Sequence, residues 1–205
     1  MTPTNNHIYH QLRDRIVTVT YKPGEPLNEM RLAAEFNVSR TPIRETLIRL
    51  CGDGFVSLTP RRGAHINNVN LQDFKSLIDY RVLLEKGLAP LVIAHMDDAH
   101  IHQLEQLHQT VQKAPADQIK ALMGCDTRYH AILRSAAGNP LLDRGLGNIQ
   151  LHFTRVEYLI RYKPKRLPVE LPQTIAALKE RDGRKLEQLL VEHVHFFVKQ
   201  VKSSL

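Results

Sequence analysis

The sequence predicts a mainly α-helical protein, in which a small helical unit with a β-hairpin precedes an all-α helical bundle. Two observations predict the first part: two short helical segments lie close together between residues 28 and 53, and a two-strand pattern with a basic turn follows them. A third observation predicts the bundle, because apolar residues recur every three or four positions from Leu71 onward.

The composition is that of an ordinary globular protein. The chain has 205 residues, 42% hydrophobic and 24% charged, which allows one large or two small domains. The net charge of +7 suits a polyanion or a membrane surface. No apolar run approaches the roughly 18 residues of a membrane span, and the N-terminus lacks an apolar secretion core, so we expect a cytoplasmic protein. Cys51 and Cys125 lie far apart at apolar helical positions and are expected to be buried, reduced thiols.

The first predicted helix covers residues 5–19, and a loop over residues 21–26 leads from it to a second helix. The apolar stripe of the first helix consists of Ile8, Leu12 and Ile16. Asn28 is a suitable N-cap for the second helix, because its side-chain oxygen can accept from N–H groups of the first turn. Leu32, Ala33 and Phe36 then form one apolar face.

A tight turn and a third helix follow. Asn37 stands where the chain reverses, and Asn tolerates the left-handed conformation. Ser39 is expected to cap the third helix, Pro42 lies in its first turn, and Gly54 ends it. The buried face consists of Ile43, Leu47 and Leu50. The polar residues near the beginning are expected to point away from that face: Arg40, Thr41, Arg44 and Thr46.

The alternation over residues 55–59 and 64–66 predicts two strands, joined by the turn Pro60-Arg61-Arg62-Gly63. Two helices and a basic hairpin in this order predict a winged helix-turn-helix over residues 1–68. The third helix would insert its first turn into the major groove of DNA, and Arg61 and Arg62 would reach the minor groove or the backbone. The alternative is that these arginines only solvate a small helical domain.

The segment VSRTPIRETLIRL (residues 38–50), followed by Gly-Phe-Val and the Pro-Arg-Arg-Gly turn, resembles the DNA-binding domain of GntR-family transcription regulators. The resemblance implies that five residues lie at the DNA: Ser39, Arg40, Thr41, Arg44 and Gly63. The family commonly has Arg where this chain has Met30, and Arg31 is the expected replacement.

The remaining chain, residues 71–205, predicts a bundle of about six helices. We expect helices over residues 71–96, 98–114, 116–137, 140–162, 174–181 and 184–202. Pro168 and Pro172 are expected to keep the stretch before the helix at residues 174–181 irregular. The segments LIDYRVLLEKGLAPLVIA (77–94), DTRYHAILRSAAGNPLL (126–142) and EHVHFF (192–197) resemble the effector-binding and dimerisation domain of the FCD subgroup of GntR regulators.

Asp126 and His130 are four residues apart, hence on one face of a helix, and can bind one divalent metal. His193 could close on the same cavity. The FCD resemblance implies that these three residues are ligands of a metal such as zinc or nickel, and that a fourth ligand, a His, belongs where Leu171 stands. Glu170, His152 or His195 could compensate for it. The alternative is a hydrogen-bonded Asp126–His130 pair in a polar pocket without metal.

Arg81 lies in an apolar helix, where it could pair with the carboxylate of an organic-acid effector. A salt bridge to Glu85, one turn later, is the alternative. The basic run over residues 161–166 is expected to be a solvated loop.

Together these features predict a transcription regulator that binds an operator as a homodimer and responds to a small carboxylic acid in the bundle. The dimer follows from the family and from the twofold symmetry of operators, not from a sequence pattern. The alternatives are a metal-dependent enzyme using Asp126, His130 and His193, for which no nucleophile or general acid/base is evident, and a DNA-binding protein without effector. The sequence does not identify the operator, the effector or the sign of regulation.

Overall fold

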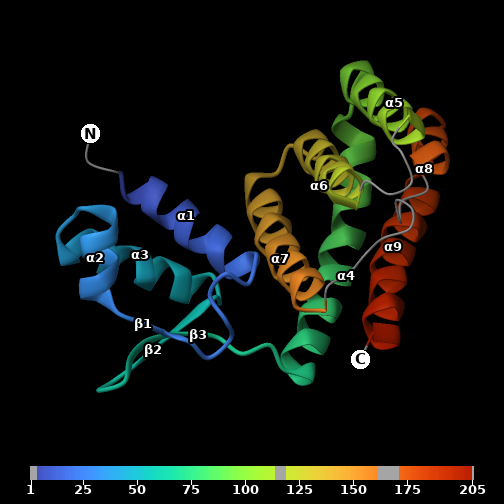
Figure 1. Cartoon of the computed structure of the whole chain (residues 1–205). Coiled ribbons are helices and arrows are strands. Elements are labelled where there is room, and N and C mark those ends of the chain that lie inside the picture. The colour runs from blue at the N-terminus through green and yellow to red at the C-terminus, as the bar shows by residue number, and fades with distance from the viewer. Residues whose placement is uncertain (1–3, 114–118, 161–170, 205) are drawn as a thin grey trace. The chain divides into compact units, whose positions relative to one another are not determined.

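The computed structural model describes residues 4–113, 119–160 and 171–204, and it divides into two compact units. The first unit consists of Met1–Leu71 with Leu151–Leu159, and the second of Gln72–Gln150 with Ile160–Leu205. Figure 1 labels the helices and the short strands. The mainly α-helical fold predicted from the sequence is confirmed.

Three helices begin the first unit: α1 (Asn5–Val17), α2 (Glu29–Phe36) and α3 (Arg40–Gly52). α2 begins after Asn28, whose side chain accepts from two N–H groups of the first turn, as predicted. Asn37 adopts the left-handed conformation (φ 53°, ψ 50°) and turns the chain into α3. α3 ends at Gly52, two residues before Gly54, whose φ of 81° the missing Cβ permits.

The apolar stripes of α1 and α3 form the core of the first unit. Six of their side chains are 0% exposed: Ile8, Leu12, Ile16, Ile43, Leu47 and Leu50. Burying each such side chain stabilises the fold by about 1.5–3 kcal/mol. Cys51, next to this stripe, is only half-buried, so the prediction of two buried thiols holds only for Cys125; both thiols are free.

A three-stranded antiparallel sheet completes the unit, in the order β1-β3-β2. Its strands are β1 (Pro26–Leu27), β2 (Val56–Thr59) and β3 (Gly63–Ile66). The β2–β3 hairpin was predicted, but β1 falls where a loop was expected. Pro26 and Leu27 pair with His65 and Ala64, and proline is tolerated there because β1 is an edge strand, where its missing N–H breaks no ladder.

The described part of the second unit is helical apart from short connections. Its helices are α4 (Leu71–His95), α5 (Asp98–Lys113), α6 (Ile119–Ala136), α7 (Pro140–Leu159), α8 (Leu171–Lys179) and α9 (Gly183–Ser204). The end of α7, Leu151–Leu159, belongs to the first unit.

These helices follow the predicted ranges closely. The exception is α8, which begins three residues before the expected Thr174. Pro172 lies in its first turn, where proline costs no hydrogen bond, so the prediction of an irregular stretch was wrong for Pro172, while Pro168 lies outside the described residues.

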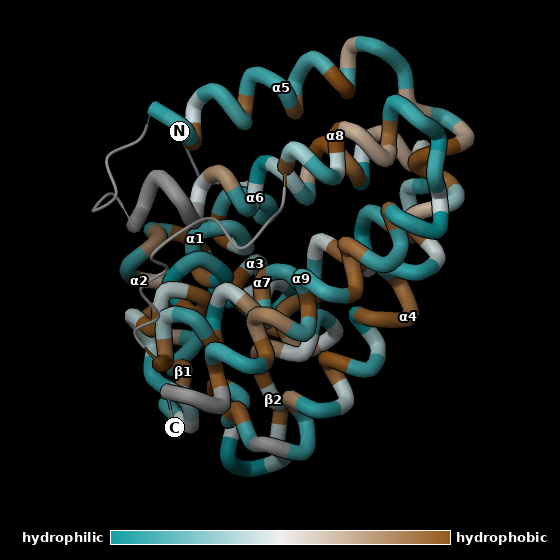
Figure 2. Tube along the Cα trace, turned by 90° about the vertical axis from the view of Figure 1, so that its right-hand side faces the viewer, coloured by the Kyte–Doolittle hydropathy of each residue, from teal (hydrophilic) through white to brown (hydrophobic). Residues whose placement is uncertain are grey.

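The helices of the second unit bury one face each against a common apolar core. Figure 2 shows this pattern on α5, a largely hydrophilic tube on which hydrophobic positions recur; the buried ones are Leu104 and Leu107. α5 packs against α6 and α8, and α8 packs against α9. Within the described ranges, none of the helices is both long and apolar enough to span a bilayer.

Candidate nucleic-acid interface and metal site

α3 presents an exposed polar surface at its beginning. Ser39, Arg40, Thr41 and Arg44 are all exposed. Ser39 occupies the N-cap position, but among the described residues its side chain makes no capping hydrogen bond, contrary to the prediction. Thr46 was expected to share this polar surface and does not. It is 3% exposed, because it lies three residues after Ile43 and therefore on the buried face.

Two of the predicted DNA-binding arginines stand on either side of the turn between α2 and α3. Arg31, in α2, is exposed. Arg40, in α3, donates from Nη2 to Glu29 Oε2 of α2 at 3.1 Å, and its side chain is 67% exposed. An exposed pair of this kind contributes at most about 1 kcal/mol, so Glu29 holds the Arg40 guanidinium only weakly.

The hairpin tip, Pro60 to Gly63, carries the other predicted DNA contacts, and we call it the wing tip. Arg61 (φ 66°) and Gly63 (φ 76°) both adopt the left-handed conformation, and Arg62 N donates to Thr59 O at 3.2 Å. Arg61 and Arg62 are exposed. The tip therefore presents two guanidinium groups to solvent on a short, hydrogen-bonded turn.

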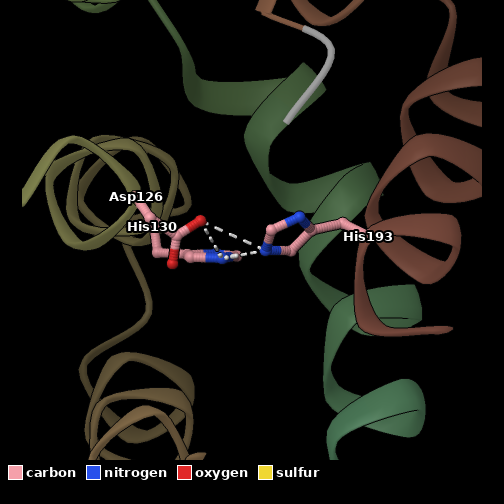
Figure 3. Close-up of side chains that lie close together, drawn as sticks. All are labelled: Asp126, His130 and His193. Carbon is pink, nitrogen blue, oxygen red and sulfur yellow. Dashed lines mark hydrogen bonds and ion pairs between the residues drawn. The ribbon is translucent and has the colours of Figure 1, made fainter. Parts of the chain in front are cut away.

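The three predicted metal ligands come together in the second unit. Asp126 and His130 lie on α6, His193 lies on α9, and Figure 3 shows the three side chains pointing toward one another. His130 Nε2 is 3.0 Å from His193 Nε2. Asp126 Oδ1 is 3.3 Å from His193 Nε2 and 3.9 Å from His130 Nε2. All three donor atoms thus face a common point between two helices.

The electrostatics of this cluster favour the protonation states that bind a cation. Burial lowers the pKa of the His130 imidazole well below its usual value, which keeps the ring neutral at pH 7. Burial alone would raise the pKa of the Asp126 carboxyl, but the neighbouring His193 and His130 outweigh it and hold that pKa below its ordinary range. A neutral imidazole and an ionised carboxylate are the forms that ligate metals.

The geometry of the cluster fits a divalent ion. Three atoms at the separations above lie on a circle of about 2.0 Å radius, close to the Zn–N and Zn–O bond lengths of about 2.0–2.2 Å. Asp126 Oδ1 is buried and, within the described part of the chain, has no hydrogen-bond partner. A buried carboxylate oxygen in that state costs free energy, which a bound cation would remove.

Arg81 and Glu85 of α4 border the same cluster. Arg81 Nε donates to Glu85 Oε1 at 3.3 Å, and Arg81 Nη2 lies 3.1 Å from His130 Nε2. Both residues are buried, at 4% and 1% exposed. Of the two roles left open for Arg81, the structure therefore contains the salt bridge. Burial raises the pKa of Glu85, and the Arg81 charge opposes that shift.

Tyr129, which was not predicted as a site residue, also contacts this cluster. It is 1% exposed, its hydroxyl lies 3.3 Å from Thr174 Oγ1, and its ring packs edge-on against His130 and His193. Its spacing of three residues from Asp126 was an available signal.

The expected fourth ligand position holds an apolar residue that is 1% exposed within the apolar core, Leu171. Of the residues named as substitutes, His195 and His152 do not replace it. His195 is exposed, and His152 belongs to the first unit, where its Nε2 lies 2.9 Å from Asp53 O. Glu170 lies outside the described residues, as does the basic run over 161–166.

Comparisons with known proteins cover both parts of the chain. Residues 4–66 match the family model described as bacterial regulatory proteins, gntR family, and residues 76–196 match the FCD domain. The chain is 28% identical over 204 residues to the HTH-type transcriptional repressor RspR of Escherichia coli K12. The alignment covers 98% of this chain and 90% of that protein.

Two further likenesses span almost the whole chain. An uncharacterized HTH-type transcriptional regulator of Bacillus subtilis, YdhC, is 27% identical over 209 residues, covering 100% of this chain and 93% of that one. The solved structure of E. coli McbR/YncC superposes with a TM-score of 0.81 at 19% identity, covering 99% of each chain, so the two share a fold.

Proposed function

The chain belongs to the GntR family of bacterial transcription regulators and carries an FCD domain, and we propose that it binds an operator as a homodimer and responds to a small metabolite. The observation that carries this proposal is the exposed cationic beginning of α3 beside a wing tip with two exposed arginines. We assign DNA binding to residues 1–68, and effector binding and dimerisation to residues 71–205. The family consists of transcription regulators, so the metal-dependent enzyme considered from the sequence is set aside.

In the proposed complex the first turn of α3 enters the major groove. Arg44 is the candidate for a bidentate bond to guanine, and Ser39 and Thr41 would form hydrogen bonds to phosphates or bases. Arg31, Arg40 and the wing tip add contacts to the backbone or the minor groove. The repressor activity named for the E. coli relative favours repression as the mode of action.

The apolar surface of α4 and α7 is the proposed dimer contact. Leu83 of α4 is 67% exposed and Leu141 of α7 is 76% exposed. The two helices approach each other closely near these residues, since a Cβ on Gly145 would lie 3.4 Å from Leu84 Cδ1 and 3.5 Å from the Tyr80 hydroxyl. Large apolar side chains exposed on adjacent helices favour an interface, and a second copy of this chain is the occupant that a twofold operator requires.

The buried polar cluster of the second unit is the proposed effector site. Asp126, His130 and His193 would hold a divalent metal such as zinc or nickel, which would supply a positive charge for the carboxylate of an organic acid. The residues support this because they form a buried, donor-rich site of matching size.

Two experiments test the proposed function. Selection of bound DNA from a random pool should yield a short inverted repeat, and recovery of no preferred sequence would contradict operator binding. A thermal-shift screen of carboxylic acids, with and without added zinc, should find acids that raise the melting temperature by mass action. If no acid does so in either condition, the effector role of the bundle is wrong.

A further inference from the structure

One nitrogen atom, His130 Nε2, has two competing uses. It belongs to the donor triangle with Asp126 and His193, where it lies 3.0 Å from His193 Nε2, and it also lies 3.1 Å from Arg81 Nη2. A guanidinium group only donates hydrogen bonds and has no acceptor. In the Arg81 contact, His130 Nε2 must therefore be the unprotonated nitrogen, which offers its lone pair to the guanidinium N–H.

The same lone pair is the one that a metal would need. An unprotonated imidazole nitrogen has a single lone pair in the plane of the ring, so it can accept from Arg81 or bind an ion, but not both at full strength. A guanidinium charge next to an ion also repels it, and the repulsion is strong because Arg81 is 4% exposed. Partners that support a metal-bound His instead contact its other nitrogen.

Glu85 is placed to receive the guanidinium when it leaves His130. Glu85 Oε1 already pairs with Arg81 Nε at 3.3 Å and lies 3.9 Å from His130 Nδ1, the nitrogen away from the donor triangle. Its other oxygen, Oε2, is buried and without a hydrogen-bond partner among the residues described. A two-pronged Arg–carboxylate pair, with both oxygens occupied, is the stronger arrangement for such a pair.

We infer that Arg81 is a built-in competitor of the metal: its guanidinium occupies the metal-facing nitrogen of His130, and Glu85 is the acceptor to which it moves when an ion binds. The inference rests on the metal site proposed above. It makes metal affinity in the free protein weaker than the three ligands alone would give. It also couples the metal to any anion that draws Arg81 away, and such coupling is reciprocal.

Zinc titration of the full-length protein against a chromophoric chelator tests the inference. The informative variant is the double substitution Arg81→Met/Glu85→Gln. It removes the guanidinium that donates to His130, and it also removes the Glu85 charge, so that no unpaired buried carboxylate is left. Arg134→Met is the matched control, because Arg134 is a cation of α6 that pairs with Asp143 at 2.9 Å. Asp126→Ala reports on the metal site itself, and circular dichroism checks the fold of each variant.

The double variant and Arg81→Met should both bind zinc at least about tenfold more tightly than wild type, the scale on which neighbours of a ligand alter metal affinity, and Arg134→Met should stay close to wild type. A merely structural Arg81 would leave the affinity unchanged or weaken it, and that result in the double variant would overturn the inference. Zinc binding that Asp126→Ala does not weaken would overturn the metal site itself.

A spectroscopic readout applies to the metal-free protein. The ¹⁵N shift of His130 Nε2 in wild type should show a hydrogen-bonded acceptor, and in Arg81→Met it should move toward the value of an unprotonated nitrogen with one donor fewer. An unchanged shift in a folded Arg81→Met protein would contradict the contact on which the inference depends.

Discussion

The hydroxyl of Tyr9 donates a hydrogen bond to Asp53 Oδ2 at 2.7 Å. Tyr9 is in α1 and Asp53 is the C-cap residue of α3, so this bond joins the first helix to the end of the proposed recognition helix. Burial and the bond to Asp53 raise the pKa of Tyr9 to about 12. The proton on Tyr9 is thus held more tightly in the folded protein than in the unfolded chain.

This shift predicts a loss of stability at alkaline pH. Because the folded pKa lies above the unfolded value, the stabilisation is fully present below about pH 10 and disappears as the pH rises toward 12. The difference in unfolding free energy between wild type and Tyr9→Phe should therefore shrink over that interval. Denaturant unfolding from pH 7 to 11.5 measures it, and a constant difference would contradict the assigned hydrogen bond.

Arg62→Ala should weaken DNA binding evenly across sequences. Its guanidinium is at the exposed wing tip, where it is proposed to contact phosphate, so its removal should lower the slope of log affinity against log salt by about one. Gel-shift titrations at several salt concentrations give the slope. An unchanged slope would mean that Arg62 does not contact the DNA backbone.

Leu83→Glu combined with Leu141→Glu should dissociate the proposed dimer. Placing two carboxylates in an apolar interface should raise the dimer dissociation constant at least about tenfold, equivalent to about 1.4 kcal/mol. Analytical ultracentrifugation measures it, with Leu58→Glu as control because Leu58 is an exposed leucine of the first unit. If the double variant stays as dimeric as the control, the contact lies elsewhere.

Leu171→His should tighten zinc binding and lower stability at the same time. The substitution restores the imidazole that the FCD resemblance implies at this position, but it buries a polar ring in the apolar core at a cost of about 1–3 kcal/mol. Isothermal titration with zinc and thermal unfolding check the two effects. A folded variant with unchanged zinc affinity would show that residue 171 does not reach the ion.

The elements that depend on local chemistry were predictable from the sequence. Asn28 caps α2 and Asn37 reverses the chain, because both effects act within four residues. The helices of the bundle followed from apolar periodicity. Prediction failed where distant segments decide the outcome: the two residues of β1 become a strand only because β3 pairs with them.

In the candidate site, too, features set by local spacing were predictable and contacts between distant residues were not. The spacing of Asp126 and His130 placed both residues on one helical face, and the prediction that His193 closes on the same cavity was supported by the family resemblance. The contact between Arg81 and His130 spans 49 positions, and no periodicity gives the distance between two helices. The choice between an Arg81–Glu85 pair and an open guanidinium therefore needed the structure, as did the partial exposure of Cys51. The burial of Thr46, by contrast, could have been predicted from its spacing of three residues from Ile43.

The central claim, sequence-specific DNA reading by the beginning of α3, is tested most directly by binding of Arg44→Ala to a selected operator and to a scrambled duplex. Fluorescence anisotropy with full-length protein measures both, with Arg184→Ala, an exposed arginine of α9, as control. We predict that Arg44→Ala loses roughly 1–3 kcal/mol on the operator and far less on the scrambled DNA. Wild-type affinity of Arg44→Ala for the operator would contradict the claim.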